Sequence, residues 1–386
     1  MKEVLILGAG YTGMTAAAGL AGRVKRRDDV HITLVNPQTR FTERLRLHQI
    51  ASGQTLEDLH IPDRLTSTGV DFVKGWVTGI DAAAQTVRID DDVTLRYDTL
   101  VYALGSVTDT AGVPGVDEFA YSLTSGQDAA MLAAHLDRMA DGTVVVAGGG
   151  LTGVESAAEI AEQHPGLDVV LLSRQTPGSM MGAKARARLH AGLNRLGVQV
   201  RAGVDIVKVM ADGVALADGE VIAAQAVLWT TGVRVSPLAV AAGLTVDDRG
   251  RIVTDESLRS VSHPNVYAVG DAAAIRQGYG VIHGTCQSGI PTAMHAAASI
   301  TRELKGKHPK AFRFGYVHQP VSLGRKDAVI QFTRPDDTPR RFYLAGWLAA
   351  AYKETVSSSP WPTFRLIRVF PWLGSATWRR GGRSTR

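Results

Sequence analysis

The chain has 386 residues, which at roughly 100 to 200 residues per domain predicts two or three domains with cores of their own. With 45% hydrophobic and 20% charged residues it has the composition of a globular enzyme, and its single cysteine, Cys286, excludes an intramolecular disulfide, a redox-active cysteine pair and a cysteine-rich metal site. We predict no metal. The net charge is +5, but residues 361–386 hold six arginines and no acid, so the preceding 360 residues sum to about −1. Basicity confined to one end argues against a nucleic-acid-binding face.

The first residues run directly into an apolar strand, with no basic leader and no small-residue cleavage site. No apolar run reaches 18 residues, so no transmembrane helix is expected. We therefore expect a cytoplasmic protein whose contact with any membrane is peripheral.

A strand, a glycine-rich turn and a helix open the first half of the chain. The apolar strand 4–7 is followed by Gly8-Ala9-Gly10-Tyr11-Thr12-Gly13, a small-residue helix over 14–20, and a second strand over 31–35. In such a unit the first glycine makes the turn, the second lets the backbone approach a pyrophosphate, and the third lets helix and strand pack closely. The amides of the helix N-terminus then hold the anion.

The same pattern returns about 140 residues later. Strand 143–147 leads into Gly148-Gly149-Gly150-Leu151-Thr152-Gly153, helix 154–163 and strand 168–172. One such motif is weak evidence, because glycine-rich turns are common. Two in the same strand, turn and helix context predict an α/β protein with two Rossmann-like dinucleotide-binding units.

Further strands are expected between and after these units, at 70–77, 86–89, 99–103, 198–200 and 227–229. Two of them end in small turns, Ala103-Leu104-Gly105-Ser106 and Thr230-Thr231-Gly232-Val233, which suit a chain crossing between domains beside a nucleotide. A later segment, Tyr267-Ala268-Val269-Gly270-Asp271, places an acid where a strand gives way to a helix. Asp271 is expected to accept hydrogen bonds from a polyol, or alternatively to serve only as a helix N-cap.

In this order the two glycine motifs, the Ala103 and Thr231 turns and the Asp271 segment resemble the FAD-dependent pyridine nucleotide oxidoreductases, flavoproteins with two dinucleotide-binding domains. The resemblance implies FAD on the first unit, NADH or NADPH on the second, and Asp271 on the ribityl chain of FAD. Since no cysteine pair is present, disulfide reductases and sulfide oxidation are set aside. The best match is to type II NADH dehydrogenases and the related apoptosis-inducing-factor-like quinone reductases, which implies hydride transfer to FAD and then electron transfer to a quinone-like acceptor.

The resemblance also implies a domain layout. We expect a discontinuous FAD-binding domain at 1–110 and 245–310, an NAD(P)H-binding domain at 111–244, and a small α+β C-terminal domain at 311–386. Strands of this last domain are expected over 314–329, followed by a helix that begins at Trp347. Val77 joins the cofactor-binding candidates of the FAD domain.

Two departures from the family concern the nucleotides. Asn36 stands where the family usually has an acid for the adenosine ribose; it can still hydrogen-bond, so FAD is expected but held less tightly. In the second unit Ser173 and Arg174 replace an acid. They can donate hydrogen bonds and positive charge to a 2′-phosphate, so NADPH is slightly favoured over NADH. The alternative for Arg174 is an ordinary solvated loop residue.

A third departure concerns the acceptor. The family's Ala-Gln-x-Ala-x-Gln signature corresponds here to Ile282-His283-Gly284-Thr285-Cys286-Gln287, where only Gln287 matches. His283 is a candidate proton donor to a reduced quinone, or alternatively a histidine tied to backbone at the start of a helix. Cys286 is expected to be a small buried residue and not a nucleophile.

Four side chains complete the candidate site. Glu155 matches the family's glutamate near nicotinamide and flavin. The alternative is that Glu155 is only a first-turn glutamate favoured by the helix dipole. Arg44, Arg46 and His48 lie in the loop expected beside the flavin, where a cation stabilises the anionic reduced form. We expect one of these three to be functional and the others to be solvated.

The tail 361–386 interleaves aromatic residues with arginines, which suits contact with anionic lipid. The alternative is a tail that packs on the body of the protein or mediates a homodimer, because two prolines interrupt any long helix. Two other functions stay open at this point: a soluble reductase that serves a ferredoxin or a partner oxygenase, and a flavin-based redox sensor.

Overall fold

The computed structural model describes residues 1–372. Its first unit is a parallel sheet in the order β19-β7-β1-β2-β3. The strands are β1 Lys2–Leu7, β2 Val30–Asn36, β3 Val70–Lys74, β7 Thr99–Tyr102 and β19 Val266–Ala268. The buried parts of β1, β2 and β7 are largely apolar, as strands covered on both sides must be.

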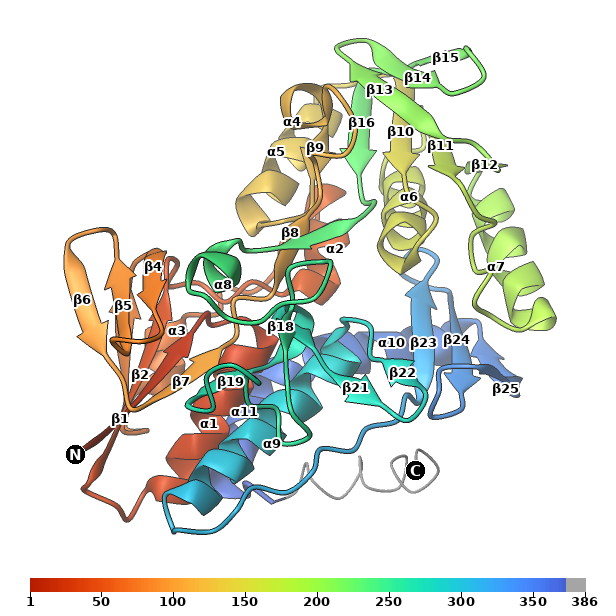
Figure 1. The fold of residues 1–386 in the computed structure, drawn as a ribbon. Helices are drawn as coiled ribbons and strands as arrows, with labels where there is room; N and C mark the ends of the chain where they lie inside the picture. The colour runs from red at the N-terminus through yellow and green to blue at the C-terminus, as the bar shows by residue number, and fades with distance from the viewer. Residues whose placement is uncertain (373–386) are drawn as a thin grey trace.

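Three helices from distant parts of the chain lie together in the first unit. They are α1 Tyr11–Val24, α9 Cys286–Glu303 and α11 Pro360–Val369, which run side by side in the lower half of Figure 1. Small residues let α1 and α9 approach closely, since a Cβ on Gly19 would lie 3.1 Å from that of Ala297. The short helices of this unit are η1 Arg44–Arg46, α3 Ile61–Leu65, α8 Leu238–Ala241 and η2 Gly270–Ala272. The short helix α2 Leu47–Ala51 follows η1 but packs in the core of the second unit.

The single strand predicted over 70–77 is divided in two, and that prediction was wrong. The chain leaves β3 at Gly75 and starts β4 Val77–Asp81, which pairs with β5 Thr86–Ile89 and then β6 Val93–Arg96. Packing enforces the break, because a Cβ on Gly75 would lie 2.3 Å from the Ile89 side chain. The remaining short strands of this half are β18 Ile252–Val253, β20 Ala273–Ala274, β21 Arg276–Gln277 and β22 Gly280–Val281.

The second unit repeats the parallel arrangement in the order β12-β11-β10-β16-β9. Its strands are β9 Tyr121–Ser122, β10 Gly142–Ala147, β11 Leu167–Ser173, β12 Gln199–Ala202 and β16 Ala226–Trp229. Its helices are α4 Val116–Phe119, α5 Gly126–Leu136, α6 Leu151–Gln163 and α7 Ala183–Arg195, and a small antiparallel sheet joins β13 Ile206–Met210, β14 Gly213–Leu216 and β15 Val221–Ala223. This unit forms the upper part of Figure 1. The two units are linked by β8 Ser106–Thr108, which pairs with β17 Val233–Val235.

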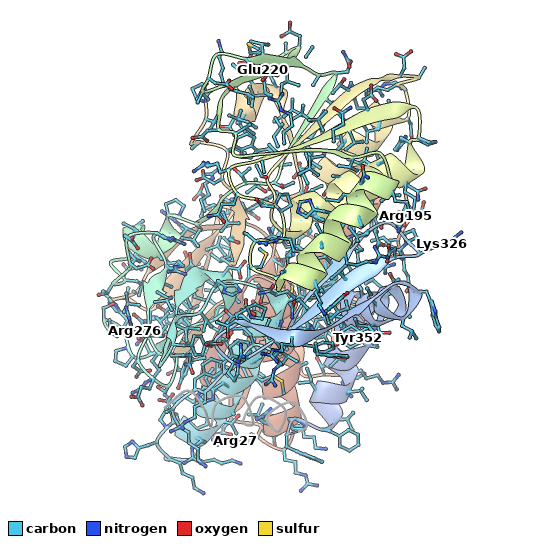
Figure 2. The ribbon with its side chains drawn as sticks, turned by 90° about the vertical axis from the view of Figure 1, so that its right-hand side faces the viewer. Arg27, Arg195, Glu220, Arg276, Lys326 and Tyr352 are labelled. Atoms are coloured by element: carbon cyan, nitrogen blue, oxygen red, sulfur yellow. The ribbon has the colours of Figure 1, made fainter. Side chains whose placement is uncertain are left out.

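A third unit packs below the second one. It consists of β23 His318–Ser322, β24 Ala328–Thr333, β25 Pro339–Ala345 and α10 Trp347–Ser358. The helix begins at Trp347 as predicted, whereas 314–316 is extended chain outside any strand. Asp327 ties this unit to α7 through Arg188 at 2.6 Å and Arg195 at 2.7 Å; Figure 2 shows Arg195 beside the third unit.

The described part of the basic tail is helical. Pro360 and Pro362 lie in the first turn of α11, where a missing N–H costs nothing. Phe364 and Ile367 are buried in the core of the first unit, and Phe364 packs edge-on against Phe41. The tail therefore packs on the body of the protein as far as it is described. Residues 373–386, with Trp378, Arg379 and Arg380, lie outside the described residues.

A histidine between two carboxylates makes the first unit sensitive to pH. The imidazole of His31 on β2 lies 2.7 Å from Glu3 and 2.8 Å from Asp71, and the carboxylates of Asp71 and then Glu3 raise its pKa above 6.5. Because the folded pKa is the higher one, the stabilisation is complete below about pH 6.5 and is lost as the pH rises through the folded value. We expect about 0.5 kcal/mol after solvent screening, since the ring is partly exposed. Urea unfolding of wild type and His31→Gln between pH 5.5 and 8.5 measures it; a constant difference between the two would contradict the assignment.

Candidate functional site

The first glycine turn has the close packing that its sequence predicts. Gly8 has φ +91°, and a Cβ on it would lie 2.7 Å from the Ala103 carbonyl oxygen. A Cβ on Gly13 would lie 1.7 Å from the Gly8 carbonyl oxygen, whereas one on Gly10 would meet nothing within 4 Å. The turn is thus filled by protein on one side and leaves backbone accessible on the other, at the N-terminus of α1. This is a cradle for a pyrophosphate.

Asn36 and Tyr11 brace this turn from within the protein. The Asn36 carbonyl oxygen accepts a hydrogen bond from the Ala9 N–H at 2.9 Å, and its amide donates to the Gln38 carbonyl at 2.8 Å. Tyr11 is buried with its ring edge-on to Phe41. Val77, another candidate, begins β4 beyond the kink at Gly75.

Four segments meet around Asp271. Its carboxylate accepts a hydrogen bond from the Ser106 hydroxyl at 2.8 Å, and the Arg44 guanidinium donates to the Ser106 carbonyl. A Cβ on Gly284 would lie 2.4 Å from the Asp271 carboxylate. Thr12 packs against Gly270, since a Cβ added to Gly270 would lie 2.8 Å from the Thr12 methyl group. Residues predicted from separate motifs are therefore brought together at the junction of α1, β8, η2 and α9.

The second glycine turn has the same geometry. Gly148 has φ +121° and faces Thr230, a Cβ on Gly153 would lie 1.8 Å from the Gly148 carbonyl oxygen, and one on Gly150 would meet nothing within 4 Å. Leu151 and Thr152 form the first turn of α6. Thr231 and Gly232 follow β16 and lead into β17, so they lie where the chain returns from the second unit to the first.

A shallow cavity of about 840 Å³, wide open to solvent, lies at the end of β11. Its lining includes Arg174, Gln175, Thr176 and Ser179. The Ser173 hydroxyl donates to the Gln175 carbonyl at 2.7 Å, and the largely exposed Arg174 pairs with Asp205 at 3.0 Å. A cation and several hydroxyl groups thus line the end of the strand where an adenosine ribose is expected.

Glu155 is buried away from solvent. Its carboxylate lies 2.9 Å from the Lys353 ammonium, accepts hydrogen bonds from the Ser322 N–H at 3.0 Å and hydroxyl at 3.2 Å, and lies 4.0 Å from His48. Burial favours the protonated form, but Lys353, His48 and the Ser322 bonds outweigh it and lower the pKa of Glu155. Glu155 is therefore an ionised group where α6, α2 and the third unit meet.

Arg44, Arg46 and His48 lie just before and within the start of α2, and Arg44 is exposed whereas Arg46 and His48, contrary to expectation, are not solvated. Arg44 contacts the Ser106 carbonyl, and Arg46 pairs with Glu354 at 3.1 Å. His48 is 3% exposed, and burial lowers its pKa to about 4. The segment passes from η1 into α2 at Leu47, which turns the three side chains in different directions. Arg44 alone reaches the group around Asp271.

His283 and Gln287 join the start of α9 to the third unit. The His283 ring stacks on Tyr316 at 4.4 Å and lies 3.3 Å from Asp337. The Gln287 amide donates to the His318 carbonyl at 2.8 Å and its oxygen accepts from the Val317 N–H at 2.6 Å. Cys286 is half-buried and not fully buried as expected. Desolvation of its thiol and then the Asp271 carboxylate raise its pKa to about 12, which disfavours the nucleophilic thiolate.

Sequence reasoning missed Ser106, Lys353 and Arg325. Arg325 reaches Glu354 at 2.6 Å and the buried Glu159 at 3.4 Å, so it joins the third unit to α6. Ser106 follows directly on the Ala103 turn and was within reach of that motif. Lys353 and Arg325 carry no local signal, since each acquires its partner through contacts between distant segments.

The comparisons with known proteins agree with this geometry. A profile of the family described as pyridine nucleotide-disulphide oxidoreductase matches residues 2–299. The chain belongs to this family. It is an FAD-dependent oxidoreductase that uses NADH or NADPH, and the residues around the first turn and Asp271 fit the flavin nucleotide.

Relatives named as dehydrogenases align over most of the chain. An NADH dehydrogenase-like protein of Mycobacterium tuberculosis is 32% identical over 354 residues, covering 85% of this chain and 87% of its own. A type II NADH:quinone oxidoreductase of Staphylococcus saprophyticus is 28% identical, covering 85% and 89%. The sulfide:quinone oxidoreductase of Aquifex aeolicus has the same fold, with a TM-score of 0.82 at 17% identity, over 96% of this chain and 92% of its own.

Proposed function

We propose that this flavoprotein passes electrons from NAD(P)H through FAD to a quinone-like acceptor. The observation that carries the proposal is the convergence of the first turn, Ser106, Asp271 and Gly284 at one junction, in a chain whose relatives include named quinone oxidoreductases. The chain has one cysteine, so a dithiol cannot take the electrons from the flavin. A diffusible acceptor is then the simplest destination.

The protein's own residues bind, orient and shield the cofactors in this proposal. The amides at the start of α1 hold the FAD pyrophosphate, Asp271 accepts from the ribityl hydroxyls, and Arg44 supplies positive charge beside them. Bound FAD supplies the capacity to accept a hydride and release electrons. The second turn and the cavity beside Arg174 hold NAD(P)H. Glu155 fastens α6 to the third unit and is the candidate on the nicotinamide side. His283 and Gln287 join the start of α9 to the third unit and are the candidates on the acceptor side.

The same proposal assigns the domains. Residues 1–110 and 245–310 bind FAD, 111–244 bind NAD(P)H, and 311–386 form the C-terminal domain. Support comes from β19, which lies far along the chain yet joins the sheet of β1, and from the paired strands β8 and β17 that link the two units.

Contact with a membrane and self-association are further parts of the proposal. None of the helices in residues 1–372 is long and apolar enough to cross a bilayer. Several large apolar side chains of the third unit and α11 are exposed, namely Phe342, Trp347, Leu348, Leu366, Val369 and Phe370. We place the peripheral membrane contact on α11 and the tail, at the inner face of the membrane, and a homodimer contact on the third unit.

Anaerobic stopped-flow reduction by NADH and by NADPH, followed by mixing with menadione, tests the electron path. Fast flavin bleaching and fast reoxidation by menadione are expected. Reoxidation no faster than with trace oxygen would exclude a quinone as the electron acceptor. Turnover with an iron-sulfur protein alone would then indicate a reductase for a partner protein. A long-lived charge-transfer complex would indicate a redox sensor.

Arg174 provides a test of nucleotide preference. Arg174→Ala is expected to raise the KM for NADPH about tenfold, because a charge-assisted bond to the 2′-phosphate is lost, with little change for NADH. Asp205→Asn is the control, since it releases Arg174 from its ion pair and is expected to lower the KM for NADPH. Equal effects of Arg174→Ala on both nucleotides would leave Arg174 a solvated loop residue.

A further inference from the structure

A groove on the first unit lies apart from the cofactor sites. It has a volume of about 480 Å³ and is bounded by α1, by the segment 57–70 with α3, and by α11. Met14, Ala18, Leu59 and Leu65 make part of its lining apolar, and Trp361 and Phe364 of α11 form another wall. The groove therefore offers an aliphatic chain a place to lie.

Three arginines gather on one side of this groove, namely Arg64 from α3 and Arg365 and Arg368 from α11. Among residues 1–372 none of them forms an ion pair with a carboxylate, and Arg368 donates to the Ser67 carbonyl at 3.0 Å. The acids nearby are largely committed elsewhere: Asp58 pairs with Arg40 at 3.2 Å and Asp63 with His60 at 3.0 Å. Glu57 is the remaining carboxylate of the lining. With Arg40 counted, four arginines stand against Glu57, Asp58 and Asp63, so the groove and its ion pair sum to a formal charge of +1.

Arg64 is held in a position that favours binding of an anion. Its guanidinium stacks over the Trp361 ring at 4.5 Å, and its Nε is buried without a hydrogen-bond partner. Burial and then the like charge of Arg365 lower its pKa. A phosphate between the terminal nitrogens of these guanidiniums would relieve the repulsion of Arg64 and Arg365.

We propose that this groove binds an anionic phospholipid, with the phosphate on Arg64 and Arg365 and an acyl chain along Trp361 and Phe364. A lipid fits better than a free phosphate because apolar lining continues from the cations, and because Leu366, Val369 and Phe370 are exposed on and beside the same helix. The inference rests on the membrane contact proposed above and makes it specific. Arg64 belongs to the FAD-binding unit, so the site is built jointly by the body of the protein and its tail.

Vesicles of phosphatidylcholine with and without phosphatidylglycerol test the proposal. Arg64→Gln is expected to weaken partitioning onto phosphatidylglycerol vesicles about tenfold, the effect of losing a charge-assisted bond. Arg96→Gln is the matched control, because it removes the same charge from an exposed position on β6 and is expected to change partitioning less than about twofold. Equal losses in the two variants would reduce the effect to net charge and overturn the site.

Two further measurements keep the outcome decisive. Brominated phosphatidylglycerol is expected to quench tryptophan fluorescence more in wild type than in Trp361→Phe, and the difference reports on the groove because the exposed Trp347 and Trp372 are present in both proteins; equal quenching would remove the acyl chain from the groove. Full protection by glycerol phosphate against vesicle binding would show that the site takes a soluble phosphate instead.

Flavin content and menadione turnover show whether each variant is folded. If Arg64→Gln does not fold, vesicle partitioning of the exposed variant Arg365→Gln tests the proposal in its place. Lipid binding is read without turnover, so failure here and failure of quinone reduction are separate results.

Discussion

Gly13→Ala is expected to abolish both stable folding of the first unit and retention of FAD. Its Cβ would lie 1.7 Å from the Gly8 carbonyl oxygen, and because this obstruction is backbone, no flexible side chain can yield. We expect a loss of about 4 kcal/mol or more in the free energy of unfolding, the range reached only by severe single substitutions. Urea unfolding and the flavin absorbance of the purified protein measure the two effects.

Gly10→Ala is the matched control for that clash. The added methyl group meets nothing within 4 Å of protein, so the apoprotein is expected to unfold within about 0.5 kcal/mol of wild type. FAD retention is nevertheless expected to fall, because the methyl group stands where the backbone approaches the pyrophosphate. Full flavin content in Gly10→Ala would show that the nucleotide does not pass this turn.

Lys353→Met is expected to destabilise the protein by about 3–5 kcal/mol, the cost of leaving a buried carboxylate without its partner. In this variant Glu155 keeps only its hydrogen bonds from Ser322. His48 lies nearby, but burial holds it neutral. The double variant Glu155→Gln with Lys353→Met is expected to recover most of the loss, since both charges are gone. Urea unfolding of the four proteins forms the cycle, and additive losses would show that the two groups do not interact.

The effect of Lys353→Met should depend on pH in a defined direction. In wild type the pKa of Glu155 is lowered, so its stabilisation is present above the unfolded value near 4.5 and is lost as the pH falls. Without Lys353, burial raises that pKa, and the folded state favours the protonated acid. The deficit of the variant should therefore shrink toward pH 4.5 and grow toward neutrality. A deficit that does not change with pH would place the cost in lost packing and not in the ion pair.

Much of the fold was predictable because it depends on short-range rules. The two glycine turns and the strands that lead into them follow from local backbone geometry and hydrophobic pattern, whereas the start of α10 at Trp347 was implied by the family resemblance. The break at Gly75 was missed because the apolar pattern continues through it, and only the packing of Ile89 shows that the chain must turn there. The helix α11 was missed because the prolines were read as interruptions, although a proline in the first turn is compatible with a helix.

The features of the candidate site likewise fall into those set by neighbouring residues and those set by packing between distant segments. By itself the sequence determined that the chain carries two dinucleotide-binding turns, an acid at Asp271 and no cysteine pair, because each of these is a property of neighbouring residues. Only the tertiary structure decided that Glu155 meets Lys353, that Gln287 fastens α9 to β23, and that Arg64 and Arg365 share a groove. Such contacts join residues that are 30 to 300 positions apart. Their charge and burial depend on how the units pack, and no local pattern encodes that.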